Sequence, residues 1–147
     1  MSLKDWLLNG WLVEHKTSPQ EIAELLDIAD RDLIDCQLPG LSPDRKLSTA
    51  YNATLQIAKA ALAVIGFRAG REAHHFWTLQ SLEFTVGYDK KLLEKLDGFR
   101  KKRNISDYER AGAVSDKEAD EMFELMKKLT NDFKIWLRNN YPELLTL

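Results

Sequence analysis

Apolar residues recur every three or four positions along most of the chain, the spacing that gathers them on one face of an α-helix. The first long stripe follows Ser18-Pro19, an N-cap and a proline at the first helical position, and predicts a helix from about Pro19 to Gln37. A second stripe follows Ser42-Pro43 and predicts a helix that stops at Gly66. The two stripes consist of Ile22, Leu25, Leu26, Ala29, Leu33 and Ile34, and of Leu47, Tyr51, Leu55, Ala58, Leu62 and Ile65.

The rest of the chain predicts further helices joined by short connections. Residues 67–71 are expected to form a basic loop, followed by a third helix that ends near Gly87 and a fourth over about 89–109. Ser115 and Glu118 form a capping box before the last helix, and Pro142 follows its end. The segment from Leu3 to Val13 is expected to be helical. The later stripes are Phe76, Leu79, Leu82 and Val86; Leu92, Leu96 and Phe99; and Met122, Met126, Leu129, Phe133 and Trp136, with Trp6 and Trp11 as packing rings near the start.

The fold class follows from this pattern. No segment alternates apolar and polar residues over the length of a strand with turn signals at both ends. Short connections between amphipathic helices favour antiparallel neighbours. The sequence therefore predicts an all-α fold, an up-and-down antiparallel bundle of five to six helices. The 147 residues are expected to form a single domain, with a bundle core over 18–140 and an N-terminal helical extension over 1–17.

The composition indicates where the protein is expected to occur in the cell, but it says little about its chemistry. Cys36 is the only cysteine, which excludes an internal disulfide and fits a reducing, cytoplasmic environment. The longest apolar stretch, from Ala60 to Phe67, is far shorter than the ~20 residues of a membrane span, and the first residues do not form a convincing secretion signal. The net charge is −2, so the distribution of charge matters more than its total.

Polar chemistry concentrates at the end of the fourth predicted helix. One further step along its apolar stripe reaches Arg103, and the next reaches Asp107, with Asn104 and Tyr108 as a parallel pair beside them. A charge on an inward face costs desolvation unless it is paired or lines a cleft. Three interpretations stay open: a salt bridge that closes the end of the bundle, a cleft for a ligand or partner, and a catalytic site.

A basic run leads into this cluster. Seven basic residues lie between Lys90 and Arg103, whereas the second and last long helices are acidic. This asymmetry could guide RNA phosphates to one edge, or an acidic partner such as a second copy of the chain, or it could simply be a solvated face. Within the run, Arg100, Lys101 and Lys102 directly precede Arg103.

The order of several short motifs resembles the HEPN domains, small helical bundles of prokaryotic toxin–antitoxin, defence and nucleotidyltransferase-associated systems. The resemblance covers roughly residues 18–140. It rests on Ala50-Tyr51-Asn52-Ala53 with Ala58 and Leu62 before Gly66-Phe67-Arg68, on His74 or His75 opening the next helix, on Arg103-Asn104 followed by Asp107-Tyr108, and on Ser115-Asp116-Lys117-Glu118-Ala119 with Phe133.

What the resemblance implies depends on one missing residue. Active members of that family are metal-independent ribonucleases with an Arg, a polar residue after it, and a His beyond four to six intervening residues, commonly at a homodimer interface. Arg103 and Asn104 match, but Tyr108 stands after four intervening residues, and Glu109 and Arg110 follow. The chain thus resembles the branch with Asp-Tyr in place of His. Without an imidazole, proton transfer near neutral pH loses its usual agent.

Other candidate sites are weaker. Glu72 and His75 have the Glu-x-x-His spacing of di-iron bundles, but the chain offers no second such pair, so no metal or cofactor is expected. Arg68 and Arg71 lie in a Gly-flanked segment that could present them to an anion, although a plain helix connection is favoured. Nothing in the sequence places a base near Cys36, which is expected to be a small buried hydrophobe.

The leading hypothesis is a non-catalytic HEPN-like binding module, expected to be a homodimer. Its ligand would be RNA, a nucleotide, or a nucleotidyltransferase-type or antitoxin-type partner protein. Arg103 would bind an anion or carboxylate, Asn104 and Tyr108 would form hydrogen bonds, and Asp107 would orient Arg103. The site is expected to include Tyr51, His74, His75, Arg100, Lys101 and Lys102 as well. The alternative is a metal-independent endoribonuclease in which Arg103, Asn104 and Tyr108 act catalytically.

Overall fold

The computed structural model of the chain describes residues 2–108 and 112–145, without the side chains of residues 106–108. These residues are mostly helical, which confirms the predicted helical class. The elements are α1 (Leu3–Leu8), β1 (Leu12–Glu14), α2 (Pro19–Asp35), α3 (Pro43–Val64), β2 (Phe67–Ala69), α4 (His74–Gln80), the 3₁₀ helix η1 (Ser81–Glu83), α5 (Lys90–Tyr108), α6 (Asp116–Asn140) and the 3₁₀ helix η2 (Pro142–Leu145).

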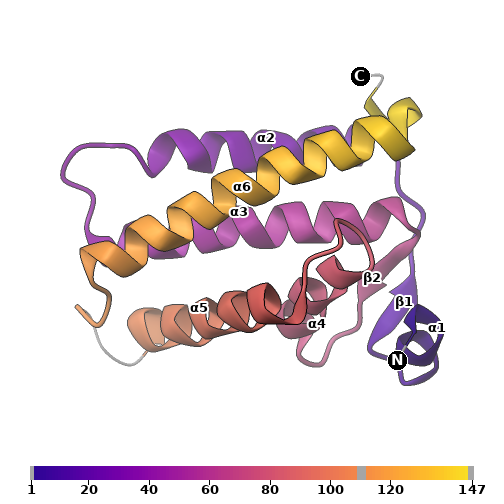
Figure 1. Ribbon diagram of the computed structural model, residues 1–147, viewed down its shortest axis with the longest axis horizontal. Coiled ribbons are helices and arrows are strands. Elements are labelled where there is room, and N and C mark those ends of the chain that lie inside the picture. The colour runs from indigo at the N-terminus through magenta and orange to yellow at the C-terminus, as the bar shows by residue number, and fades with distance from the viewer. Residues whose placement is uncertain (1, 109–111, 146–147) are drawn as a thin grey trace.

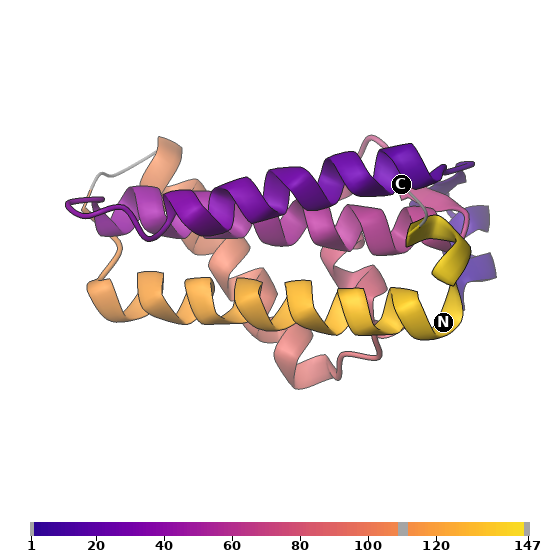
Figure 2. The ribbon, with the colours of Figure 1, turned by 90° about the horizontal axis from the view of Figure 1, so that it is seen from above.

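Helix α3 is the centre of the molecule and packs against α2, α4, α5 and α6. In Figure 1, α2 and α6 lie along the upper side of α3, and α4 and α5 lie along the lower side. The colours show that α3 runs opposite to α2 and in the same direction as α6, and Figure 2 shows that α5 crosses these helices obliquely. Because α3 contacts so many neighbours, its buried residues occupy every side of the helix, including Leu47, Tyr51, Ile57 and Leu62.

The predicted start signals cap the long helices. The Ser18 hydroxyl accepts a hydrogen bond from the backbone N–H of Glu21 at 3.1 Å, and α2 begins at the following proline. In the capping box of α6, the Glu118 N–H donates to the Ser115 hydroxyl at 3.1 Å, and the Ser115 N–H donates to the Glu118 carboxylate at 3.0 Å. These bonds satisfy N–H groups that a helix leaves without an internal partner.

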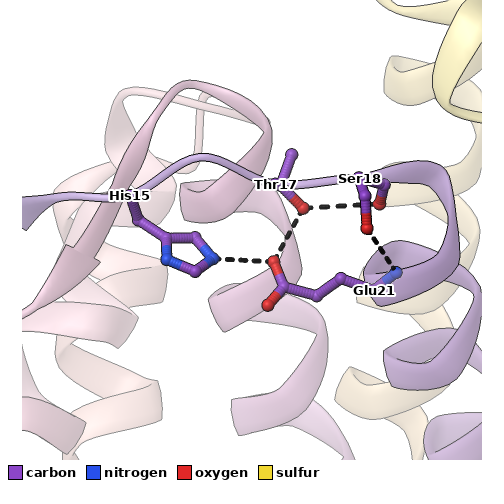
Figure 3. A network of polar contacts seen from close by, with 4 residues as sticks. All are labelled: His15, Thr17, Ser18 and Glu21. Atoms are coloured by element: carbon purple, nitrogen blue, oxygen red, sulfur yellow. Dashed lines mark hydrogen bonds and ion pairs between the residues drawn. The ribbon is translucent and has the colours of Figure 1, made fainter.

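A polar network joins the end of β1 to the start of α2 (Figure 3). The Glu21 carboxylate lies 2.8 Å from Nε2 of His15 and accepts a hydrogen bond from the Thr17 hydroxyl at 2.7 Å. Burial acts to raise the pKa of Glu21, but the contacts with His15 and Thr17 outweigh it and leave that pKa below its ordinary value. The network thus fixes the direction in which the chain enters α2.

The expected basic loop at 67–71 is wrong, because Phe67–Ala69 forms a strand. It pairs antiparallel with β1 in the register Leu12 to Ala69 and Glu14 to Phe67. The expected N-terminal helix from Leu3 to Val13, and with it the helical extension over 1–17, is also corrected: the helix ends at Leu8 and a strand follows. Each strand has three residues, too few for an alternating pattern, and its partner lies more than fifty residues away in sequence.

This pair of strands closes a small second core at one end of α3. Trp6 and Leu12 are buried there against Leu62, and Trp77 lies 4.8 Å from Trp6 between ring centroids. Trp11 stacks on Trp77 at 4.0 Å, so the expected packing role of Trp6 and Trp11 is confirmed. The helix that the sequence predicts to end near Gly87 is α4, which ends earlier, at Gln80, and is followed directly by η1. Among the described residues, no helix has both the length and the apolar character needed to cross a membrane.

Candidate functional site

Arg103 faces the centre of the molecule. The inner face of α5 carries Leu96 and Phe99, both buried, and one step further it carries Arg103. The guanidinium carbon of Arg103 lies 5.4 Å from the ring centroid of Tyr51, and its Nε atom is buried. Tyr51, on α3, is 1% exposed. A guanidinium above a buried ring gains a cation–π attraction, which is larger where water is excluded. The Arg103 side chain therefore packs onto α3.

An imidazole meets the same tyrosine from a third helix. Nδ1 of His75, in the first turn of α4, lies 3.4 Å from the Tyr51 hydroxyl, a distance at which the hydroxyl donates only a weak hydrogen bond to a neutral ring. The adjacent His74 ring is exposed and lies edge-on to His75 at 4.4 Å. Side chains from α4 and α5 thus converge on one tyrosine of α3.

Arg100 extends the cluster along α5. Its Nε donates to the Asp97 carboxylate at 2.6 Å, and its guanidinium carbon lies 5.7 Å from the ring centroid of Phe76. The Asp97 side chain is only 16% exposed. Neither Asp97 nor Phe76 was among the site residues predicted from sequence. The spacing of Asp97 three residues before Arg100 was the available signal, because such pairs meet on a helix surface.

The environment keeps both central groups uncharged at neutral pH. Burial, with the neighbouring His74, Arg103 and Arg100, lowers the pKa of His75 to about 4. Burial raises the pKa of Tyr51 to about 12, although Arg103 and Arg100 act in the opposite direction. The described side chains of the cluster at pH 7 are therefore two guanidinium groups, one carboxylate, a neutral imidazole and a phenol. The cluster can attract an anion.

The other residues predicted for the site lie in several different environments. Lys101 pairs with Asp97 at 3.5 Å, and Lys102 turns toward α6 and pairs with Glu118 at 3.3 Å. Asn104 is half-buried. The side chains of Asp107 and Tyr108 lie outside the described residues, so the predicted role of Asp107 in orienting Arg103 stays a prediction.

The basic run of α5 is partly neutralised by acidic neighbours. Lys95 pairs with Glu121 of α6 at 3.0 Å, in addition to the pairs of Arg100, Lys101 and Lys102. Because these cations already face carboxylates, the length of the basic run overstates the attraction of α5 for an anion.

The weaker sequence candidates occupy ordinary positions. Glu72 is exposed, whereas His75 lies against Tyr51, and no group of three potential metal ligands is found in the part of the chain that the structure describes. Cys36 is buried, as expected, and burial raises the pKa of its thiol to about 11, which leaves it protonated.

The lowered pKa of His75 predicts a pH-dependent stability. Between pH 6.5 and pH 4 the unfolded chain binds a proton at His75 that the folded chain does not, so the free energy of unfolding falls as pH falls. Discounted for partial exposure, this loss amounts to about 1–2 kcal/mol. Denaturant unfolding at several pH values, for the protein and a His75→Gln variant, measures it. Equal losses in both proteins over that window would contradict the prediction.

Comparisons with models of protein families, with curated proteins and with solved structures found no match to this chain.

Proposed function

We propose that this chain is a HEPN-like helical binding module that binds single-stranded RNA where Arg103, Arg100 and His75 meet around Tyr51. The observation that carries the proposal is the convergence of side chains from α4 and α5 on the buried Tyr51 of α3, with the Arg103 guanidinium 5.4 Å from its ring. A guanidinium supplies charge and paired N–H donors for a phosphate, and a neutral imidazole supplies a polar ring that a base can stack on.

The surrounding charges support an anionic ligand over an acidic protein. Among the described side chains the cluster contains one carboxylate, Asp97, and that group is already bonded to Arg100. A phosphate is compact enough to reach guanidinium groups that are partly recessed, whereas the carboxylates of a protein partner would need to align with several separate cations. RNA is therefore the ligand that this arrangement favours. The homodimer and the nucleotidyltransferase-type or antitoxin-type partner remain proposals that follow from the family resemblance.

Binding of a fluorescein-labelled RNA of about twelve nucleotides, measured by fluorescence anisotropy, tests the proposal. We expect Arg103→Gln to weaken binding about tenfold, because it removes a charge-assisted contact, and to lower the salt dependence of the affinity. The matched control is Arg138→Gln, which removes an exposed arginine near the far end of α6 and should leave the affinity unchanged. Equal affinities for the two variants would refute the proposal.

A second candidate function is endoribonuclease activity, and one observation favours it. The imidazole that is missing after Arg103 in the sequence has a counterpart in His75, which lies beside the same tyrosine. A neutral imidazole can take a proton from a ribose hydroxyl while an arginine stabilises the phosphate. A pKa of about 4 makes His75 a weak base, which is why binding is the preferred function. Cleavage of the same RNA by the protein, but not by Arg103→Gln or His75→Gln, would reverse that preference.

A further inference from the structure

A second feature lies on the other side of His75. A cavity of about 460 Å³ opens between α3, β2 and the start of α4, with Leu55 and Thr78 among its walls. Its volume is within the range of small-molecule sites. Figure 1 shows β2 and the start of α4 beside the second half of α3, so the walls come from segments that are separate in sequence. His75 lines this cavity and also contacts Tyr51, which makes it the boundary between the cavity and the Arg103 cluster.

The cavity is lined by basic side chains and by no carboxylate among the described residues. These side chains are Lys59, Arg68, Arg71, His74 and His75. Glu72 belongs to the same loop, but it is exposed and is not part of the lining. Three full positive charges around one concave surface attract an anion more strongly than the same charges spread over a convex surface.

The basic side chains of the cavity differ from those of α5 in their ion pairs with carboxylates. No ion pair joins Arg68 or Arg71 to a carboxylate in the described part of the chain. Lys59 is exposed and acts on Glu21, whose pKa it helps to lower, although burial of Glu21 works against that effect. The two arginines therefore have their binding capacity available for a ligand.

The backbone holds these arginines in place. Arg68 is the central residue of β2 and pairs with Val13 of β1. The N–H of Gly70 donates to the Trp11 carbonyl at 2.8 Å, which fixes the chain between the two arginines. A side chain carried on a paired strand needs less ordering when a ligand binds than one on a free loop. Leu55 is 9% exposed and gives one wall an apolar surface.

We infer that this cavity is a binding site for a phosphomonoester dianion, with Arg68 and Arg71 as the principal phosphate ligands and Lys59 as a further cation. A phosphomonoester fits because it presents about two negative charges and three acceptor oxygens in a compact group, which several converging donors can share. The same chemistry can come from a 5′-nucleotide or from free phosphate. The apolar wall at Leu55 would contact the remainder of a nucleotide. The inference does not depend on RNA binding at Arg103.

Isothermal titration calorimetry with 5′-AMP, inorganic phosphate and adenosine tests the inference. We expect saturable binding of AMP that the double variant Arg68→Gln/Arg71→Gln weakens at least about tenfold, because two charge-assisted contacts are lost. Adenosine, without the phosphate, should bind far more weakly. AMP binding tighter than that of inorganic phosphate identifies the nucleotide as the source of the phosphomonoester, and equal binding identifies free phosphate.

Two controls separate this site from the one around Arg103. Arg103→Gln should leave AMP binding unchanged, and the Arg68/Arg71 double variant, whose side chains are exposed, should keep the circular dichroism spectrum and unfolding midpoint of the unmodified protein. Lys59→Gln, on a different element, should weaken AMP binding by a smaller factor. Absence of AMP binding at millimolar ligand, adenosine binding as tight as AMP binding, or full affinity in the double variant would each overturn the inference.

Discussion

Replacement of Phe133 by alanine is expected to lower the free energy of unfolding by about 3–5 kcal/mol. Phe133 is 0% exposed on the face of α6 that packs in the main core, and its ring lies 6.0 Å from Trp136. Truncation removes the buried ring and leaves a cavity that close-packed neighbours fill only in part. Since a domain of this size is stable by about 5–15 kcal/mol, the loss is a large share of the total. Urea unfolding followed by circular dichroism measures it.

Ile135→Ala is the matched control on the same helix. Ile135 is 46% exposed, so its truncation should cost less than about 1 kcal/mol. This pair of variants also tests the support of the candidate site. Helices α6 and α2 pack against one side of α3, and Tyr51, which contacts Arg103 of α5, is carried by that same helix α3. A similar small loss in both variants would mean that α6 is not packed on α3 in the way described.

Alanine at Gly70 is expected to destabilise the protein by about 1–3 kcal/mol, because the added Cβ has no space. The methyl group would lie 2.5 Å from the backbone oxygen of Gly10, an atom that cannot move without displacing the turn before β1. The β1–β2 pairing and the stacking of Trp11 on Trp77 should be disturbed together. Urea unfolding gives the loss of stability, and tryptophan fluorescence of the folded variant reports the change at the Trp11–Trp77 pair.

Gly98→Ala is a control for which we expect the free energy of unfolding to rise instead of fall. Gly98 lies exposed within α5, and a Cβ there would meet no atom within 4 Å. Alanine should therefore stabilise the helix by about 0.5–1 kcal/mol, since glycine is the poorer helix former. A neutral or stabilising effect of Gly70→Ala would show that the β1–β2 pair is packed less tightly than the structure describes.

The long helices could be predicted from sequence because their signals are local. The caps at Ser18, Ser42 and Ser115 and the stripes that follow them depend only on residues within a few turns of one another. The strand at Phe67–Ala69 could not be predicted in this way, because it exists through pairing with Leu12–Glu14. In such a short strand, the pairing partner decides the conformation, not the propensity of its own residues.

The candidate site also combines features that local sequence signals predict with features that depend on how distant segments pack. The inward position of Arg103 follows from the apolar stripe of α5, a pattern that the sequence displays. Its proximity to Tyr51 and His75 depends on how α3, α4 and α5 pack, which no spacing along the chain encodes. The cavity with Arg68 and Arg71 depends on β2, the start of α4 and α3 together, so it could not be predicted while residues 67–71 were taken as a plain connection.

The central claim is that an RNA strand binds over the junction of α3, α4 and α5. Titration of the ¹⁵N-labelled protein with the same short RNA, followed by ¹H–¹⁵N correlation NMR, tests it most directly. We predict that the backbone signals of His75, Arg100 and Arg103 shift or broaden while those of the acidic helix α2 stay in place. Changes centred on α2 or α6, or no change at RNA concentrations well above that of the protein, would contradict the claim.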